Sequence, residues 1–398
     1  MNVLFLTLIA IDNLEDRGIY HDLLRKFRNE GHKVVVVSPL ERGKWGHEII
    51  KRTDNEIFLR VKTLKIQKSS IVEKGIGTLL LQIQFNSTIK KYLYNIKFDL
   101  IIYSTPPITF ASVIAKIKKR DKAKCYLLLK DIFPQNAVDL GFIKNNSLLH
   151  KYFLKKEKHL YLNSDFIGCM SPANKSYLLE KHPELLGKVE VNPNSIEVRV
   201  GDISKNEFVK LRKELNIPVN RTVFIYGGNL GKPQGIEFLM EILESNELNK
   251  NVYFIIIGDG TEYLRLEQFI LAKKFTNVII KGWMENEEYE KYLQVADVGL
   301  IFLNKNFTIP NFPSRLLSYL EKKKPVLCAT DTNTDIGKIA EDNEFGFWCE
   351  NGDIIKFNNY LNIYTQNGER RETMGKNGFN YLVDNYHIES SYKTILSH

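Results

Sequence analysis

The sequence predicts an α/β protein built from two doubly wound parallel-sheet domains, and three observations carry this prediction. Its 398 residues exceed the length of one ordinary domain. Short apolar runs alternate with segments of helical spacing, which is typical of parallel strands covered by helices on both faces. The alternation stops near Asn192-Pro193-Asn194 and then restarts. This polar stretch therefore marks the boundary between two similar halves.

The first half begins with an apolar run at residues 3–8, a helical segment at 20–29 and a second apolar run at 34–37. Further apolar runs follow at residues 100–104, 125–129 and 166–170. Because helical spacing separates these runs, we expect each to be a buried strand of one parallel sheet.

The second half repeats the pattern, starting with a polar helix at 204–215. Strands are expected at 222–226, 252–257, 278–281, 298–302 and 326–329, with helices at 234–243 and 263–273. We expect domains at 1–195 and 196–375, and a final helix at 376–398 that crosses back to the first domain. Ligands of such sheets bind beyond the carboxyl ends of the strands, so two such domains facing each other should enclose a cleft.

The composition is that of an ordinary globular protein, with 43% hydrophobic and 26% charged residues. The apolar run at 3–11 lacks a preceding basic segment, which indicates a buried strand and not a signal peptide. No stretch has the roughly 18 uninterrupted apolar residues of a membrane span. The four cysteines lack CxxC spacing, so neither a zinc site nor a disulfide framework is expected. We therefore expect a cytoplasmic chain with buried, reduced thiols.

The net charge of +9 is concentrated in the first half, where residues 1–200 carry 33 Lys and Arg against 20 Asp and Glu. A basic half indicates an anionic partner: nucleic acid, an anionic membrane surface or a phosphorylated substrate. No nucleic-acid recognition module accompanies the charge, so nucleic acid is not expected. Residues 75–97 and 148–162 combine basic and apolar side chains, as an interfacial helix does. A core helix explains the same spacing, but together with the charge the two segments favour membrane contact.

Glycine-rich loops follow two strands of the second half. The loop after residues 222–226 contains Gly228, Asn229, Lys232 and Gln234, and the next loop is Gly258-Asp259-Gly260. Such loops allow backbone N–H groups to approach an anion at a helix start. Tight turns have the same composition, and the spacing matches neither GxGxxG nor GxxxxGK[ST]. A dinucleotide site or a P-loop is therefore not favoured.

The stretch from Pro310 to Glu321 places Ser314 and Arg315 directly ahead of an amphipathic helix. Proline stiffens the approach, and Ser314 is expected to cap the helix. Arg315 in the first turn opposes the helix dipole unless an anion binds there. We interpret Ser314 and Arg315 as a diphosphate site, with a plain cap and a solvated arginine as the alternative.

Three loops of the first half should reach the same edge of their sheet. They contain Asp16 and Gly18, then Thr105 and Pro106, and then Lys130 and Asp131. Asp131 ends a predicted strand beside a cation and before a proline-stiffened turn, which makes it the candidate catalytic carboxylate. A structural cap is the alternative.

These loops, in this order, resemble the retaining glycosyltransferases of family 4, whose architecture is GT-B. The resemblance covers almost the whole chain and includes GHKVVVVSP, NPNSIEV, FIIIGDG, VADVGLIFL and RRETMGKNGFNYLVDNY. YSTPP, KDIFPQNAVDLG and PNFPSRLLSYL are similar to the branch that assembles O-antigen, capsule or colanic-acid type polysaccharides on lipid carriers. Several members of that branch are similar to N-acetyl-fucosamine transferases.

The resemblance implies retaining transfer of a sugar, such as an N-acetylated deoxyhexosamine, from a UDP-linked donor to a polyprenyl-diphosphate-linked saccharide. The enzyme would be peripheral on the cytoplasmic face of the inner membrane. The implied catalytic residues are Asp131, Lys232 and Arg315. The implied donor-binding residues are Gly228, Asn229, Gln234, Gly258, Asp259, Gly260, Pro310, Ser314, Ser318 and Glu321, and those on the acceptor side are Asp16, Gly18, Thr105, Pro106 and Lys130. No Asp-x-Asp triplet occurs, so we expect neither a metal nor another cofactor.

The sequence departs from the family at charged positions. The family's Arg-x4-Lys pair falls on Asn229 and Gln234, and its Glu-x7-Glu pair falls on Pro310 and Ser318. Lys232 and Arg315 are then the nearest cations for a diphosphate, and Glu321 is the nearest carboxylate for a ribose. Two alternatives stay open: a sugar-nucleotide 2-epimerase of the same architecture, and a catalytically lapsed homologue that only binds.

Overall fold

The computed structural model describes residues 1–41, 50–63, 71–199, 201 and 203–398. The chain forms two compact units, one of Met1–Ile196 with Ile388–His398 and one of Glu197–His387. The chain thus returns to the first unit at Ile388 and not at residue 376, because the long helix before it belongs to the second unit.

The first unit contains one sheet with the strand order β3-β4-β2-β1-β5-β6-β7-β8. All neighbouring strands are parallel except β3, which runs antiparallel to β4. The strands are β1 (Asn2–Leu6), β2 (Lys33–Glu41), β3 (Ile50–Arg52), β4 (Glu56–Thr63), β5 (Leu100–Ser104), β6 (Lys124–Leu129), β7 (Phe166–Cys169) and β8 (Val189–Val191). The helices are α1 (Ile19–Asn29), α2 (Ile71–Tyr92), η1 (Ile108–Phe110), α3 (Ala111–Asp121), α4 (Gln135–Asp139), α5 (Leu148–Asn163), α6 (Pro172–Lys181), η2 (Pro183–Leu185) and the carboxyl-terminal α15 (Ile388–Leu396).

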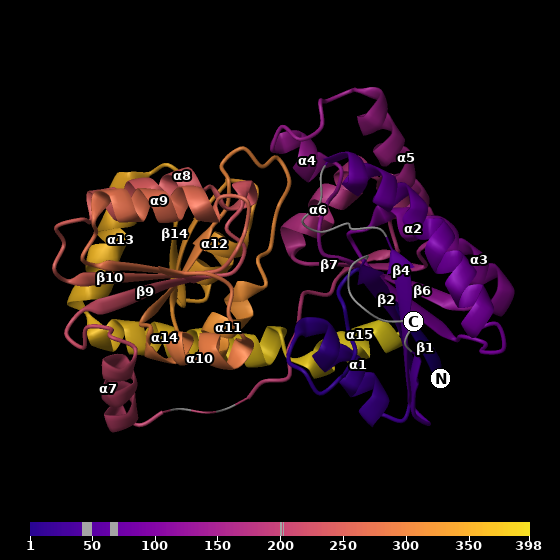
Figure 1. Ribbon diagram of the computed structural model, residues 1–398, viewed down its shortest axis with the longest axis horizontal. Coiled ribbons are helices and arrows are strands. Elements are labelled where there is room, and N and C mark those ends of the chain that lie inside the picture. Colours follow the sequence, from indigo (N-terminus) through magenta and orange to yellow (C-terminus); the bar gives the residue numbers. More distant parts are fainter. Residues whose placement is uncertain (42–49, 64–70, 200, 202) are drawn as a thin grey trace. The chain divides into compact units, whose positions relative to one another are not determined.

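The last helix is fixed to the first unit by its contacts with α1 (Figure 1). The Tyr392 ring packs against Phe27 with 4.8 Å between ring centroids. Its hydroxyl lies 2.9 Å from Nε2 of His32, and Lys26 forms a 2.6 Å ion pair with Glu389. Aromatic packing and an ion pair therefore join the two ends of the chain within one unit.

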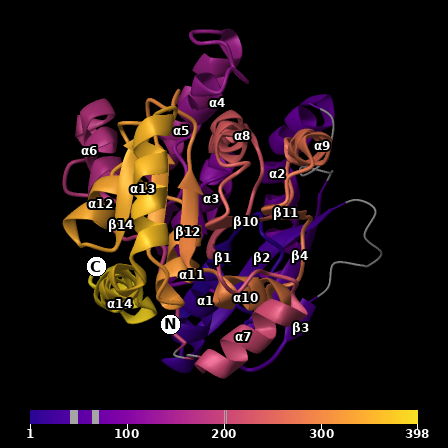
Figure 2. The same ribbon diagram turned by 90° about the vertical axis from the view of Figure 1, so that its left-hand side faces the viewer.

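The second unit contains an all-parallel sheet with the order β11-β10-β9-β12-β13-β14. Figure 2 shows β14, β12, β10 and β11 of this sheet in this order from left to right. The strands are β9 (Thr222–Gly227), β10 (Val252–Ile257), β11 (Val278–Lys281), β12 (Val298–Phe302), β13 (Val326–Thr330) and β14 (Gly346–Glu350). The helices are α7 (Lys205–Glu214), η3 (Lys232–Gln234), α8 (Ile236–Ser245), α9 (Tyr263–Lys273), α10 (Asn286–Val295), α11 (Arg315–Glu321), α12 (Ile336–Asp342), α13 (Ile354–Gln366) and α14 (Gly368–Asn385).

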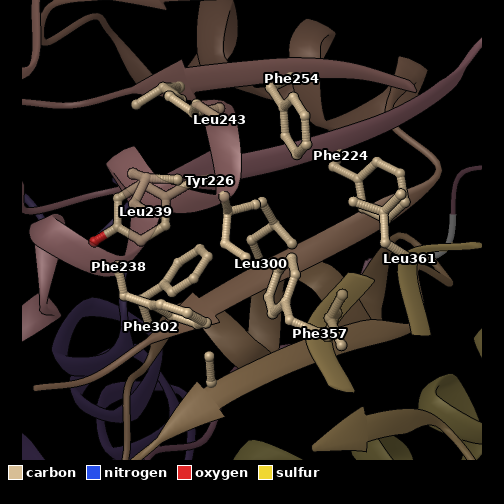
Figure 3. Packing of buried hydrophobic residues seen from close by; sticks show 14 of the residues in the cluster. Phe224, Tyr226, Phe238, Leu239, Leu243, Phe254, Leu300, Phe302, Phe357 and Leu361 are labelled. Carbon is tan, nitrogen blue, oxygen red and sulfur yellow. The ribbon is translucent and has the colours of Figure 1, made fainter. Parts of the chain in front are cut away.

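A continuous apolar core lies between this sheet and its helices (Figure 3). Alternate residues of β9, such as Phe224 and Tyr226, point into it and meet Phe238 of α8 and Phe357 of α13. Each is at most 2% exposed, and burial of each side chain favours folding by about 2–3 kcal/mol. The predicted doubly wound organisation is confirmed in both units.

Gly235 divides what the pattern at 234–243 predicts as one helix. It adopts a left-handed conformation with φ 58°, so the short η3 ends there and α8 begins at Ile236. The predicted start at Gln234 is therefore wrong by two residues. The four cysteines are buried and free, as predicted.

Candidate functional site

Two glycine loops lie against each other at the carboxyl edge of the second sheet. Gly228 N–H donates to the Ile257 carbonyl at 2.9 Å, and Leu230 N–H donates to the Asp259 carbonyl at 2.9 Å. A Cβ atom at Gly258 would lie 1.8 Å from the Gly228 carbonyl oxygen, and one at Gly260 would lie 2.3 Å from that of Leu230. Only glycine permits this approach, so the loops after β9 and β10 form one layer of backbone.

The Arg315 guanidinium lies over this layer at the start of α11. Its Cζ atom is 4.3 Å from the centroid of the Tyr226 ring, and it would lie 3.5 Å from a Cβ atom at Gly228. Its Nη1 atom is buried and has no hydrogen-bond partner in the described part of the chain. Burial acts to lower the pKa of Arg315, but Tyr226, Tyr319 and Tyr289 raise it, and the net change is upward. The site therefore presents a permanent cation with an unused buried donor.

Tyrosines hold the turn beneath this cation. The Tyr319 hydroxyl accepts a hydrogen bond from the Gly227 N–H at 3.1 Å and lies 3.2 Å from the Ile225 carbonyl. A Cβ atom at Gly227 would lie 2.1 Å from the Tyr289 hydroxyl oxygen. Burial raises the pKa of Tyr289 to about 12, so the phenol stays protonated and neutral at physiological pH. Residues from β9, α10 and α11 thus fix the Gly227–Gly228 turn.

The side chains of Asn229 and Gln234 form a hydrogen bond with each other. The Asn229 amide donates to Gln234 Oε1 at 2.9 Å, and the Gly231 N–H lies 3.2 Å from the same oxygen. At the two positions where the family that this sequence resembles has Arg and Lys, this chain therefore has amide side chains that stabilise the loop conformation. Lys232 is exposed on the same loop, and its carbonyl accepts a hydrogen bond from the Asn304 amide at 3.0 Å.

Most of the other donor-binding residues predicted between Pro310 and Glu321 make contacts within the protein or are buried. The prediction that Ser314 caps α11 is wrong, because its side chain makes no capping hydrogen bond. The Ser318 hydroxyl donates to the Arg315 carbonyl at 2.9 Å. Glu321 is buried and accepts the Arg199 N–H at 2.9 Å, while Pro310 is buried. Arg315 is the side chain of this stretch that the structure presents for an anion.

In the first unit, Thr105 joins the ends of two neighbouring strands. Its buried hydroxyl oxygen accepts the N–H groups of Lys130 at 3.1 Å and Asp131 at 3.2 Å. The structure thus brings together two predicted acceptor-side residues, Thr105 and Lys130, and the predicted catalytic residue Asp131 at the carboxyl edge of β5 and β6. Pro106, next in the chain, is exposed.

Asp131 and Lys130 are both perturbed by burial. Desolvation raises the pKa of Asp131 to about 6, although a 2.7 Å hydrogen bond from the Asn136 amide partly opposes it. Desolvation lowers the pKa of Lys130 to about 7, and its ammonium has no ion pair among the described residues. Perturbed acid and base groups at a strand end are characteristic of functional sites.

The partly buried carboxyl of Asp131 predicts a pH-dependent difference in stability. Its folded-state pKa of about 6 exceeds the unfolded value, so the free energy of unfolding falls as pH rises between about 4 and 6. Asp131→Asn should therefore match the parent near pH 4 and exceed it by up to ~2 kcal/mol near pH 7.5. Urea unfolding at the two pH values measures this, with exposed Asp54→Asn as the control. A difference that does not change with pH would contradict the raised pKa of this carboxyl.

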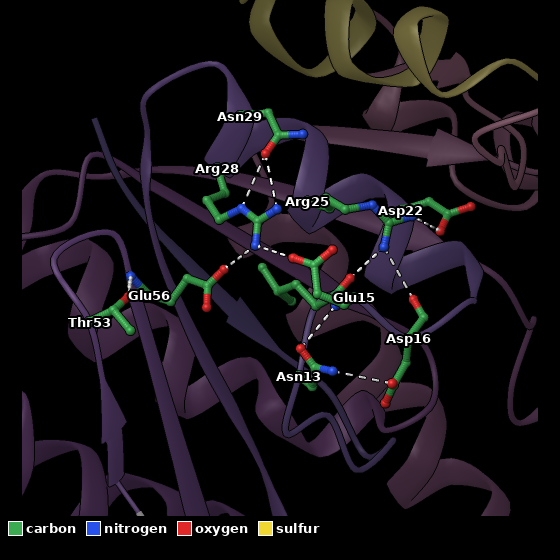
Figure 4. A network of polar contacts seen from close by, with 10 residues as sticks. Asn13, Glu15, Asp16, Asp22, Arg25, Arg28, Asn29, Thr53 and Glu56 are labelled. Carbon is green, nitrogen blue, oxygen red and sulfur yellow. Dashed lines mark hydrogen bonds and ion pairs between the residues drawn. The ribbon is translucent and has the colours of Figure 1, made fainter.

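The remaining predicted loop, with Asp16 and Gly18, is tied to α1 by arginines (Figure 4). Arg25 donates to the carbonyls of Leu14 and Asp16, and the Asn13 amide donates to the Asp16 carboxylate at 3.3 Å. A Cβ atom at Gly18 would lie 2.8 Å from Nδ1 of His21. Asp16 remains exposed, at the carboxyl edge of β1.

Sequence reasoning missed the tyrosines around Arg315 and also Trp283. Trp283 follows β11 by two residues and is 70% exposed, at the sheet edge that carries the glycine loops. A large exposed aromatic side chain at a strand end is a signal that a search for charged residues does not detect.

Comparison with known proteins assigns each unit to a class. Residues 19–200 match the family model described as Glycosyltransferase Family 4, and residues 207–381 match the one described as Glycosyl transferases group 1. The probable glycosyltransferase WbjE of Pseudomonas aeruginosa is 22% identical over 86% of this chain and 84% of its own length. The putative colanic acid biosynthesis glycosyl transferase WcaI of Escherichia coli is 23% identical over 62% of this chain and 60% of its own.

Solved structures share the fold. Sucrose-phosphate synthase from Thermosynechococcus elongatus superposes with a TM-score of 0.76 at 15% identity, covering 99% of this chain and 97% of that protein. HepE of Anabaena, solved in complex with UDP, gives 0.69 at 15% identity, covering 100% and 99%. Fold and matched models together define a glycosyltransferase of the GT-B type. Residues 19–200 thus correspond to a family 4 glycosyltransferase domain, and residues 207–381 to a group 1 glycosyltransferase domain.

Proposed function

We propose that this enzyme transfers a sugar, with retention of configuration, from a nucleotide diphosphate donor to a polyprenyl-diphosphate-linked saccharide in bacterial surface polysaccharide assembly. The buried, unpartnered Nη1 donor of Arg315 beside the glycine layer carries the proposal. The relative WcaI, named for colanic acid biosynthesis, supports the pathway class, and HepE, solved with UDP, supports a UDP-linked donor. An N-acetylated deoxyhexosamine is the sugar we propose.

The leaving diphosphate determines the chemistry required of the second unit. Negative charge builds on the departing phosphate in the transition state, and fixed cations stabilise that charge most effectively where water is excluded. Arg315 supplies such a cation, and the exposed Lys232 supplies a second on the adjacent loop. We therefore propose that protein cations replace a metal, so that EDTA leaves turnover unchanged. Trp283 offers an aromatic face for the nucleobase.

The acceptor hydroxyl requires a hydrogen-bond acceptor on the first unit. Asp131 offers a carboxylate at the end of β6, with its backbone held by Thr105 and its Oδ1 atom held by Asn136. The Asn136 amide and the Ile132 N–H both hydrogen-bond this carboxylate and fix its orientation toward the attacking hydroxyl. We assign Asp131 this role, with Lys130 beside it on the acceptor side.

We propose that α5 holds the enzyme at an anionic membrane surface. Leu148, Leu149 and Leu162 are 88%, 52% and 48% exposed, and exposed Lys151 and Lys155 lie among them. Leucine among lysines suits an interface with anionic lipids. By contrast, Leu81, Phe85 and Ile89 of α2 are buried, as in an ordinary core helix. None of the helices in the described part of the chain combines the length and apolarity of a membrane span.

Replacing two of these leucines tests the membrane face. Leu148→Ser with Leu149→Ser should weaken partitioning into phosphatidylglycerol vesicles about tenfold, because less apolar surface leaves water. The control replaces Leu248 and Leu264 of the second unit, which are 89% and 67% exposed. Co-sedimentation measures both. Equal loss in the two double variants, or no loss in either, would contradict the assignment of α5.

The transferase activity is tested by product analysis. UDP-linked N-acetylated deoxyhexoses and other nucleotide sugars are incubated with and without polyprenyl-diphosphate saccharides, and products are separated by mass spectrometry. We expect an extended lipid-linked saccharide and free nucleotide diphosphate only when both substrates are present. Conversion of the donor sugar alone would instead indicate the 2-epimerase, and absence of both binding and product would indicate a lapsed homologue.

A further inference from the structure

A second basic site lies in the first unit, at the end of its sheet opposite Asp131. A cavity of about 590 Å³ opens where β6 and β7 begin and α3 ends. Its walls include Lys118, Lys122, Lys124, Asp165, Phe166 and Lys188. The volume falls within the range of about 300–1,000 Å³ that is typical of small-ligand sites. Because the strands are parallel, this amino-terminal edge is separate from the carboxyl edge that carries Lys130 and Asp131.

The one carboxylate of the cavity pairs with only one of its four lysines. Asp165 forms a 2.6 Å ion pair with Lys118, and its other oxygen accepts the Cys125 N–H at 2.9 Å. No acidic side chain in the described part of the chain pairs with Lys122, Lys124 or Lys188. The cavity therefore carries three uncompensated positive charges.

Helix capping explains some of these lysines but not all. Lys118 and Lys188 donate to the carbonyls of Asn163 and Ser164, at 3.0 Å and 3.3 Å, where α5 ends. Cations at a helix carboxyl terminus are ordinary. Lys122 and Lys124 make no such contact, although they belong to a run of six Lys and Arg with one Asp at residues 116–124. Gathering them around one cavity has an electrostatic cost that a bound anion would offset.

We propose that this lysine-lined cavity binds a phosphate-bearing anion, at a site separate from Arg315. Lysine binds phosphate as a compact point charge, and three ammonium groups around one cavity match the charge of a diphosphate. The phosphate can come from a soluble diphosphate or from the headgroup of an anionic lipid. The proposal does not depend on the transferase reaction, and it is tested without turnover.

Lysine footprinting gives a local readout. The full chain is acylated with a water-soluble ester in the presence of inorganic pyrophosphate, phosphatidylglycerol vesicles or phosphatidylcholine vesicles, and labelling is quantified by peptide mass spectrometry. We expect pyrophosphate or the anionic vesicles to slow acylation of Lys122 and Lys124 at least threefold. Exposed Lys250 and Lys274 of the second unit should be unaffected. Protection by pyrophosphate identifies a soluble ligand, and protection by phosphatidylglycerol alone identifies a headgroup.

A pair of matched variants completes the test. Lys122→Gln with Lys124→Gln should remove the protection of Lys188 by whichever anion is effective, while Lys250→Gln with Lys274→Gln should retain it. Lys122 and Lys274 both end a helix in the left-handed conformation, with φ of 58° and 54°, so the two pairs carry comparable backbone strain. Equal labelling with and without every anion would overturn the proposal. So would protection of Lys250 and Lys274 to the same extent.

Discussion

Arg315→Ala is expected to lower kcat by about 10²–10³-fold, because it removes the cation that faces the leaving diphosphate. The guanidinium is held over Tyr226 and keeps one buried donor unused, so it is already placed before substrate binds. Steady-state kinetics with the true donor measure the loss. Arg315→Lys keeps the charge but not the planar stacking, and should recover only part of the activity.

A matched variant separates this effect from a general loss of charge. Arg265 lies in the same unit, is exposed, and pairs with Glu237 and Glu262 at 2.7 Å and 3.0 Å. Arg265→Ala should leave kcat within about twofold of the parent, since surface ion pairs contribute little. Unchanged turnover in Arg315→Ala, with the fold intact by circular dichroism, would remove the diphosphate role of Arg315.

Gly258→Ala is expected to destabilise the second unit by ~2–4 kcal/mol and to abolish nucleotide binding. The added Cβ atom would lie 1.8 Å from the Gly228 carbonyl oxygen, and backbone on both sides leaves no flexible side chain to move aside. The two loops must then separate, which displaces the turn beneath Arg315. Thermal unfolding and calorimetry with UDP measure the two effects.

Gly352→Ala is the control for backbone strain alone. Gly352 also has a positive φ, 111°, but a Cβ atom there would meet nothing within 4 Å. Its substitution should cost about 1 kcal/mol and leave UDP binding intact. If the two alanine variants behaved alike, the layered contact of the glycine loops would have no special role.

Most of the fold could be predicted because buried parallel strands are continuous apolar runs. β10, with the sequence VYFIII, is an example that matches at both ends. The strands that escaped prediction lie at or near sheet edges and lack such runs. β4 reads EIFLRVKT, β8 is three residues with a central Glu, and β14 reads GFWCE. Whether these segments join a sheet depends on contacts with residues distant in sequence, which hydrophobic periodicity does not reveal.

The candidate site was predictable only where one residue conflicts with its local surroundings. Arg315 could be identified because a cation in the first turn of a helix is unfavourable without an anion. Its tyrosine neighbours, Tyr226, Tyr289 and Tyr319, come from three elements far apart in the sequence, and only folding brings them together. The sequence shows that Asn229 and Gln234 replace two cations of the family but does not indicate their contacts. The structure shows that the two side chains form a hydrogen bond with each other. Thr105 acts through its hydroxyl on two backbone N–H groups, a role that no motif encodes.

The most direct test is a crystal structure of the chain with UDP or with the donor that product analysis identifies. We expect the diphosphate to lie against the Gly228 turn, with a phosphate oxygen within about 3 Å of Arg315 Nη1 and the base near Trp283. A nucleotide bound with its diphosphate away from Arg315 would contradict the account.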